Sequence, residues 1–145
     1  MDVGSKTMLQ ISGTTAGTDY DQVALSNGSL TYNGELALSF SGSYALGTSF
    51  SLFDGFSTHF GELDSVTLTT PVDSVYNGLA FTKSVFDGEV VWWTQPNTSG
   101  QSLKFEQATG NLIVVPEPST IVIASIGVAL AGLWRARRRK AATQA

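Results

Sequence analysis

The 145-residue chain contains no cysteine and only one histidine, His59. The absence of cysteine excludes disulfide bonds, thiol nucleophiles and thiolate metal sites. A single histidine also excludes a histidine-rich metal site, and it leaves His59 as the one candidate base for a catalytic triad. We therefore expect the fold to be held by its hydrophobic core alone. Residues 1–115 are enough for one such core.

Basic residues are scarce in the first 118 positions, which carry three lysines, no arginine and all twelve acids, a net charge of −9. Residues 119–145 carry four arginines, one lysine and no acid, a net charge of +5. A nucleic-acid-binding surface needs basic side chains to neutralise phosphates, so we expect no nucleic-acid partner. The chain divides into an acidic body and a basic C-terminal tail.

The tail combines three features in order. Pro116-Glu117-Pro118 comes first, an uncharged run at 121–134 follows, and a basic cluster comes last. The predicted membrane segment contains Ile121, Val122, Ile123, Ile126, Val128, Leu130, Leu133 and Trp134. The predicted basic stop consists of Arg135, Arg137, Arg138, Arg139 and Lys140.

The uncharged run predicts one C-terminal transmembrane helix, because a helix that is apolar on every side has no face for water. Its fourteen residues span only about 21 Å, against about 30 Å of hydrocarbon. Both a permanent and a cleaved anchor are compatible with that length. A buried core element is the weaker interpretation, since the basic residues that follow must reach water together.

The positive-inside rule places the basic end in the cytoplasm and the residues before Pro116 in the periplasm. We therefore predict three parts. They are a β-rich extracytoplasmic domain at 1–115, a sorting and anchor segment at 116–140, and a short cytoplasmic tail at 141–145.

The order of Pro-Glu-Pro, apolar run and basic cluster resembles the PEP-CTERM signal of Gram-negative bacteria. The resemblance implies that an intramembrane exosortase recognises Pro116, Glu117 and Pro118 and cleaves near them. It also implies transient residence in the inner membrane, followed by release or transfer of the body to the cell surface or extracellular matrix.

The body is predicted to be all-β, because it lacks an amphipathic helical period. At 35–41, Leu36, Leu38 and Phe40 alternate with small or polar residues, the pattern of a strand with one buried face. Similar stretches are predicted at 8–12, 20–26, 49–53, 65–69, 75–81, 89–94, 103–107 and 111–115. Asn-Gly or Asp-Gly pairs predict tight turns at 27–28, 33–34, 54–55, 77–78 and 87–88. We expect a β-sandwich or a β-helix end-cap, with no fixed repeat length.

Three segments of the body, at 9–23, 34–38 and 47–53, carry a second resemblance. Together they resemble the terminal segment of large autotransporter-like surface proteins. That resemblance covers about residues 5–115 and implies a long β-helix that leads into a closing β-rich cap.

The first ten residues contain no apolar stretch long enough for a secretory signal peptide. An exosortase-type tail requires export, so we expect the body to be truncated at its N-terminus and the signal peptide to lie upstream. A non-functional fragment of a larger surface protein is therefore one alternative.

We expect no catalytic residue, no metal and no other cofactor. Apart from His59, the polar candidates are the pairs Asp19 with Asp21 and Glu62 with Asp64. Either pair offers two carboxylates for glycoside hydrolysis. Asp19 and Asp21, with nearby carbonyls, also offer oxygen ligands for calcium. Acids on solvated turns and strand edges explain them better.

Trp92 and Trp93 are consecutive, so in a strand they point to opposite faces. We predict that one lies in the core and the other at the surface. The favoured hypothesis is a non-enzymatic surface or extracellular-matrix protein, with an exosortase and the membrane as partners. The competing hypothesis is a carbohydrate-binding β-sandwich module that uses Trp92 or Trp93 to bind extracellular polysaccharide.

Overall fold

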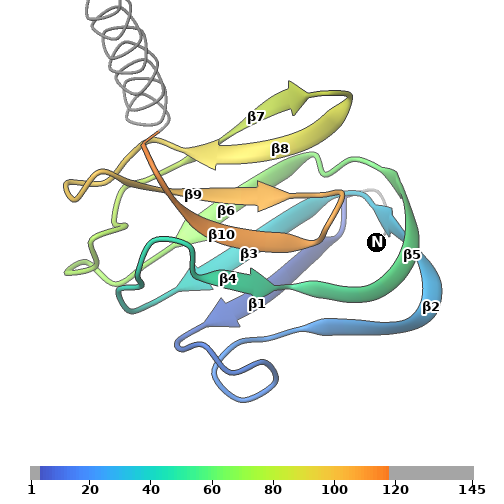
Figure 1. The fold of residues 1–145 in the computed structure, drawn as a ribbon, viewed down its shortest axis with the longest axis horizontal. Helices are drawn as coiled ribbons and strands as arrows, with labels where there is room; N and C mark the ends of the chain where they lie inside the picture. Colours follow the sequence, from blue (N-terminus) through green and yellow to red (C-terminus); the bar gives the residue numbers. More distant parts are fainter. Residues whose placement is uncertain (1–3, 118–145) are drawn as a thin grey trace, which may run out of the picture. The chain divides into compact units, whose positions relative to one another are not determined.

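The computed structural model describes residues 4–117, and within that range the chain forms strands and no helix (Figure 1). The strands are β1 (Lys6–Ile11), β2 (Val23–Tyr32), β3 (Glu35–Phe40), β4 (Ser49–Ser51), β5 (Phe53–Gly61), β6 (Ser65–Thr69), β7 (Phe81–Phe86), β8 (Glu89–Thr94), β9 (Gln101–Glu106) and β10 (Asn111–Pro116). The prediction of an all-β body is confirmed. The predicted C-terminal helix lies outside the described residues.

The first half of the body winds in stacked coils. Strands β1, β3 and β6 form one parallel sheet, and β2 and β5 form a second. Lys6 lies opposite Glu35, and Glu35 lies opposite Ser65. Val23 likewise lies opposite Phe53. The chain thus returns to the same face after 29 or 30 residues. These approximately repeating coils were not predicted from the sequence, although the interval is not fixed, as expected.

Apolar side chains stack from coil to coil on the inner face. Leu9 lies opposite Leu38, and Leu38 lies opposite Leu68. Leu9 and Leu38 are buried, and Leu68 packs against the same core. Because a parallel register places equivalent residues above one another, one strand pattern repeated in each coil produces one continuous core.

Glu35 ties the three parallel strands together on their outer face. Lys6 Nζ donates to its carboxylate at 3.0 Å, and Thr67 Oγ1 donates at 2.6 Å. The hydrogen bond from Thr67 and then the contact with Lys6 hold the pKa of Glu35 below its usual range. A lowered pKa stabilises the fold above the pKa of the unfolded chain, and this contribution is lost as pH falls through the folded-state pKa.

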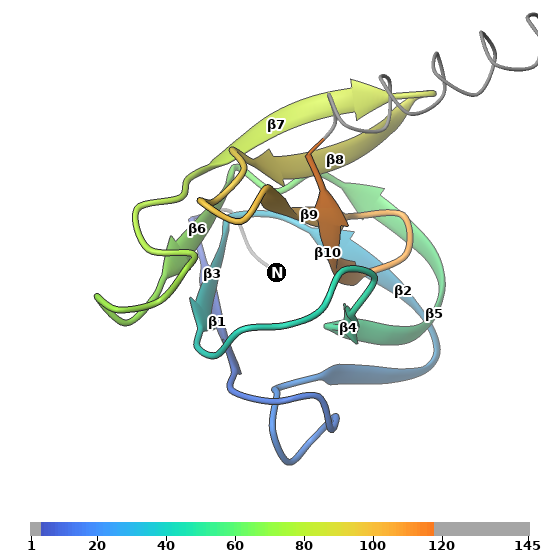
Figure 2. The ribbon, with the colours of Figure 1, turned by 60° about the vertical axis from the view of Figure 1, so that its left-hand side comes forward.

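The last four strands and the short strand β4 of the first half form a five-stranded sheet, the cap sheet, in the order β4-β10-β9-β8-β7. Its pairs β4–β10, β7–β8 and β8–β9 are antiparallel, and Figures 1 and 2 show the sheet beside the coils. Phe105 of β9 packs edge-on against Tyr32 and Phe53 of the coils, with ring centroids 6.4 and 6.3 Å apart. This cap sheet and the coils therefore share one hydrophobic core.

Asp87-Gly88 is the predicted turn that forms a two-residue hairpin, between β7 and β8, with φ angles of 50° and 82°. Asn27-Gly28 lies inside β2, where register shifts against β5 mark a bulge instead. The predicted strand at 75–81 is also wrong, because residues 75–78 form a turn and β7 begins only at Phe81. Strand β5 runs through the Asp54-Gly55 pair that predicted a turn.

The outer edge of β1 is covered near its end by the return segment 19–21. Asp21 N–H donates to the Gln10 carbonyl, and Gln10 N–H donates to Asp21 Oδ2, each at 2.8 Å. Ser12 N–H donates to the Asp19 carbonyl at 2.8 Å. Since unpaired strand edges recruit other strands, the return segment closes this part of the edge.

Replacing Asp21 with alanine should lower the free energy of unfolding by about 1–2 kcal/mol, because Gln10 N–H loses a charged acceptor. The variant should also associate more readily, since part of the β1 edge is opened. Urea unfolding and light scattering measure the two effects. Asp54→Ala is the matched control, because the side chain of Asp54 is exposed on β5 and makes no hydrogen bond or ion pair within residues 4–117. Equal losses in both variants would contradict the edge-closing role.

Candidate functional site

The last strand of the cap sheet leads without a spacer into the predicted sorting motif. Val114 is fully buried, and both of its backbone groups are paired. Its N–H donates to the Thr48 carbonyl at 2.9 Å, and its carbonyl accepts from Gly47 N–H at 2.7 Å. Only Val115 separates it from Pro116, the last residue of β10.

The sequence explains why the strand ends there. Leu112 and Val114 point into the core, so the alternation holds until the motif begins. Pro116 has no N–H to donate, and a proline is tolerated at an edge or an end of a ladder. Glu117 precedes Pro118, which keeps its backbone out of the helical region. Glu117, the last described residue, is partly exposed.

Most residues of the predicted tail lie beyond the described range. Pro116 and Glu117 are described, and Pro118 is not. The membrane residues Ile121, Val122, Ile123, Ile126, Val128, Leu130, Leu133 and Trp134, and the basic residues Arg135, Arg137, Arg138, Arg139 and Lys140, also lie outside it. Residues 4–117 contain no helix that is long and apolar enough to cross a membrane.

Three of the four paired acids, Asp19, Asp21 and Glu62, accept hydrogen bonds from other residues of the body. Asp19 Oδ2 accepts from Thr15 N–H at 3.1 Å, and Asp21 Oδ2 accepts from Gln10 N–H at 2.8 Å. Glu62 accepts from Lys83 of β7, while Asp64 is exposed. The part of the chain that the structure describes contains no group of three histidine, cysteine or acidic residues able to hold a metal.

His59 is a residue of β5, and its side chain approaches Glu89 at the start of β8. Its Nε2 is 3.6 Å from the Glu89 carboxylate, and its ring lies 6.0 Å from that of Tyr32. His59 Nδ1 and Tyr32 Oη are both buried without a hydrogen-bond partner within residues 4–117. Burial raises the pKa of Tyr32, so this phenol is neutral at physiological pH. The contacts of His59 join the coils to the cap sheet.

The two tryptophans lie on opposite faces of β8, as predicted. Trp92 is buried in the core, and its Nε1 donates to Gln107 Oε1 at 3.1 Å. Trp93 is partly exposed on the outer face, where Lys104 Nζ lies 5.3 Å from the ring centroid. A sugar that stacked on that side of Trp93 would have to displace the lysine.

Comparison with known proteins identifies a sorting motif where β10 is followed by the tail. Residues 114–140 match the family model described as a PEP-CTERM protein-sorting motif. No match was found among curated proteins or among solved structures. The resemblance of the body to autotransporter-like proteins therefore has no support from a relative.

The matched range begins inside β10 and ends at Lys140, so it covers the Pro-Glu-Pro element, the apolar run and the basic cluster. The motif implies an exosortase as the processing partner. The C-terminal part of this chain is a PEP-CTERM sorting motif, which implies export to the cell surface by membrane-anchored processing.

Proposed function

We propose that this chain is a non-enzymatic surface or extracellular-matrix protein whose body is released or transferred after exosortase cleavage. The observation that supports the proposal is the match to the sorting motif at 114–140, which begins at Val114, the last fully buried residue of the body. A cut near Pro116 or Pro118 leaves β10 complete up to Val115. The buried residues of the body therefore all lie on one side of the cut.

The proposed role of the body is to close the end of a parallel β-helix. Its support is the nearly constant sequence interval between paired positions of β1, β3 and β6, together with the antiparallel cap sheet on the same core. Closing the end of a β-helix in this way needs no cofactor.

A carbohydrate-binding role is the competing proposal, and Trp93 is the residue that it would use. The observation that favours it is the partial exposure of Trp93 on the cap sheet. The observation against it is Lys104, which lies over the ring. Without a second exposed aromatic ring beside Trp93 in the described residues, we favour the structural role.

The sorting proposal is tested by expressing the chain, with an added export signal, in cells that contain an exosortase and in matched cells that lack it. We expect the body in the surface or medium fraction only when the enzyme is present. Without the enzyme the chain should stay with the inner membrane, because the apolar run and basic cluster remain attached. The same distribution in both cells would overturn the proposal.

A further inference from the structure

Three loops are linked to one another by hydrogen bonds, and one of them pairs with the end of β10. We call the surface that they form the exit face. They are residues 42–48, 70–80 and 95–100, and Gln101 at the start of β9 lies next to the third loop. Gly47 pairs with Val114. Gln101 donates through Nε2 to the Tyr44 carbonyl at 3.2 Å and accepts at Oε1 from Tyr76 Oη at 3.1 Å. Gln101, the residue that follows the third loop, thus joins the other two loops, and the first of these pairs with the strand from which the tail continues.

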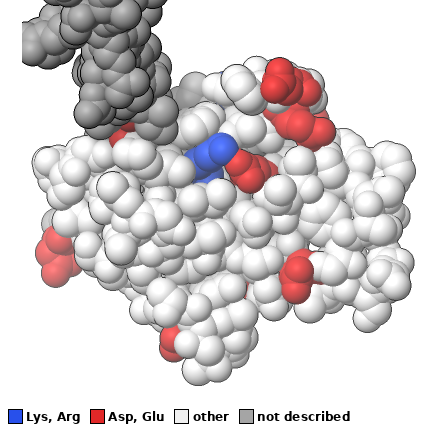
Figure 3. Space-filling view, in the orientation of Figure 1, with Lys and Arg blue, Asp and Glu red and all other residues white. Residues whose placement is uncertain are grey.

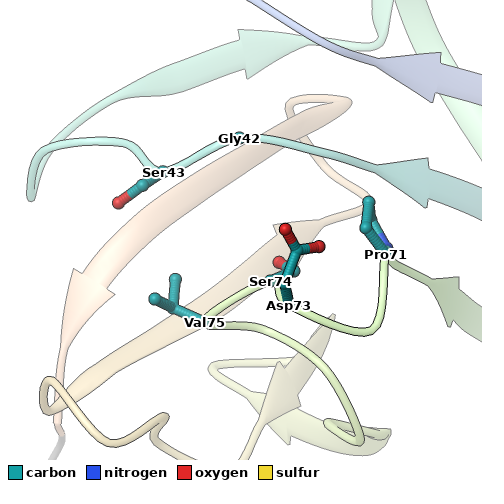
Figure 4. A pocket seen from close by; sticks show the side chains of 6 residues that line it. All are labelled: Gly42, Ser43, Pro71, Asp73, Ser74 and Val75. Atoms are coloured by element: carbon teal, nitrogen blue, oxygen red, sulfur yellow. The ribbon is translucent and has the colours of Figure 1, made fainter.

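Two of these loops also face each other across an open pocket of about 260 Å³. Figure 4 shows Ser43 on one side of this pocket and Val75 and Ser74 on the other. The pocket confirms that residues 42–43 and 71–75 are neighbours, although they lie far apart in the chain. The exit face is thus one continuous surface.

The exit face is poor in charge and carries exposed apolar side chains. Asp73 is the only charged residue in its three loops. Val72 is 89% exposed, Leu46 is 53% exposed and Val75 is 38% exposed. The view in Figure 3 shows acidic side chains in several other places on the body. An acidic protein could therefore approach an anionic surface through this face with little repulsion.

Chain length limits how far this face can be from the membrane. Six residues lie between Val114, which is fixed in the core, and Ile121, the first residue of the apolar run, so seven steps from Cα to Cα join the two. An extended chain spans at most about 3.6 Å per residue, or about 25 Å over this distance. The headgroup region of a bilayer fills about 5–8 Å of that length. While the tail is in the bilayer, the end of β10 stays close to lipid.

We propose that the exit face rests on the lipid headgroup region of the membrane until the tail is cut, with Leu46 and Val72 inserted at the interface. The inference rests on the proposed function, since it requires the tail to be in a bilayer. Exposed apolar residues also occur on the strands, at Met8, Phe60, Val85 and Phe86. What distinguishes the exit face is its place beside the outgoing chain, together with its low charge.

The lack of native cysteine makes a direct test available. Single cysteines at Leu46, Val72, Val85 and Val128 are labelled with the fluorophore nitrobenzoxadiazole, and each full-length chain is reconstituted into vesicles of phosphatidylethanolamine and phosphatidylglycerol. We expect the labels at 46 and 72 to shift to shorter wavelength and to be quenched by nitroxide-labelled lipid. The label at 85 is the matched control, because Val85 is an exposed valine of β7, and it should stay in water.

The label at 128 separates two kinds of failure. If it is not quenched by the lipid, the tail is not in the bilayer and the proposed function fails. If it is quenched while the labels at 46 and 72 stay aqueous, only the present inference is overturned. Equal quenching at 46, 72 and 85, or shielding of 46 and 72 only after an exosortase is added, would also overturn it. The last result would indicate a protein partner instead of lipid.

Discussion

Gly55→Ala should destabilise the body far more than the same change at Gly88. Both glycines have positive φ angles, +74° and +82°. A Cβ at Gly55 would lie 2.0 Å from the Leu25 carbonyl oxygen in the strand of the neighbouring coil, whereas one at Gly88 would meet nothing within 4 Å. The backbone of β2 must move to admit the methyl group, so we expect a loss of about 3–5 kcal/mol or a failure to fold.

Gly88→Ala isolates the cost of the φ angle alone. We expect it to lose about 1–2 kcal/mol, the usual penalty for alanine in the left-handed region. Urea unfolding followed by the fluorescence of the buried Trp92 compares the two variants. If Gly55→Ala is no less stable than Gly88→Ala, the close approach of β2 and β5 is wrong, and the stacked coils are wrong with it.

Replacing Pro116, Glu117 and Pro118 together with alanine should leave the chain as an uncleaved membrane form in a host with an exosortase. Each proline disfavours helix by about 3 kcal/mol relative to alanine. Their removal lets helix extend upstream from the apolar run, where peptide carbonyls are hidden from a protease. We expect membrane fractionation to show loss of the released form.

The body of the triple mutant should still fold, because its last fully buried residue is Val114. Its urea transition should therefore match that of the wild type. Pro96→Ala is the matched control, since Pro96 is an exposed proline of the loop between β8 and β9. Normal release of the triple mutant, or equal loss of release in Pro96→Ala, would show that the motif residues have no special role.

Local patterns in the sequence predicted several strands well. The alternation at 35–41 became β3, and residues 65–69 and 89–94 became β6 and β8 with the predicted bounds. These strands bury one face, or part of one, in the core, so their pattern is visible in the chain itself. The order of prolines, apolar run and basic cluster predicted the sorting motif equally well, and the match at 114–140 begins just before Pro116.

The sequence repeat that accompanies the stacked coils is present but weak. Leu9-Gln10-Ile11-Ser12-Gly13 recurs one coil later as Leu38-Ser39-Phe40-Ser41-Gly42. The next coil keeps only Leu68 of this pattern, and the interval between paired positions grows by one from the first coil to the second. A repeat that drifts in length and keeps so few residues does not stand out from one chain.

Other features depend on contacts that local patterns do not contain. Asp54-Gly55 predicted a turn because it tolerates positive φ angles, yet Gly55 uses that freedom to let two coils approach. The exit face joins loops that are distant in the sequence, through bonds such as that between Tyr76 and Gln101. The low charge of those loops was visible in the sequence, but their common location was not.

The central claim is that the chain is cut at the junction between β10 and the apolar run. Intact-mass measurement of the wild-type body, recovered from the surface or medium of cells with an exosortase, tests it most directly. We predict a C-terminus in or beside residues 116–118, with the apolar run and basic cluster absent from the mass. A recovered body whose mass extends to Ala145 would contradict the account.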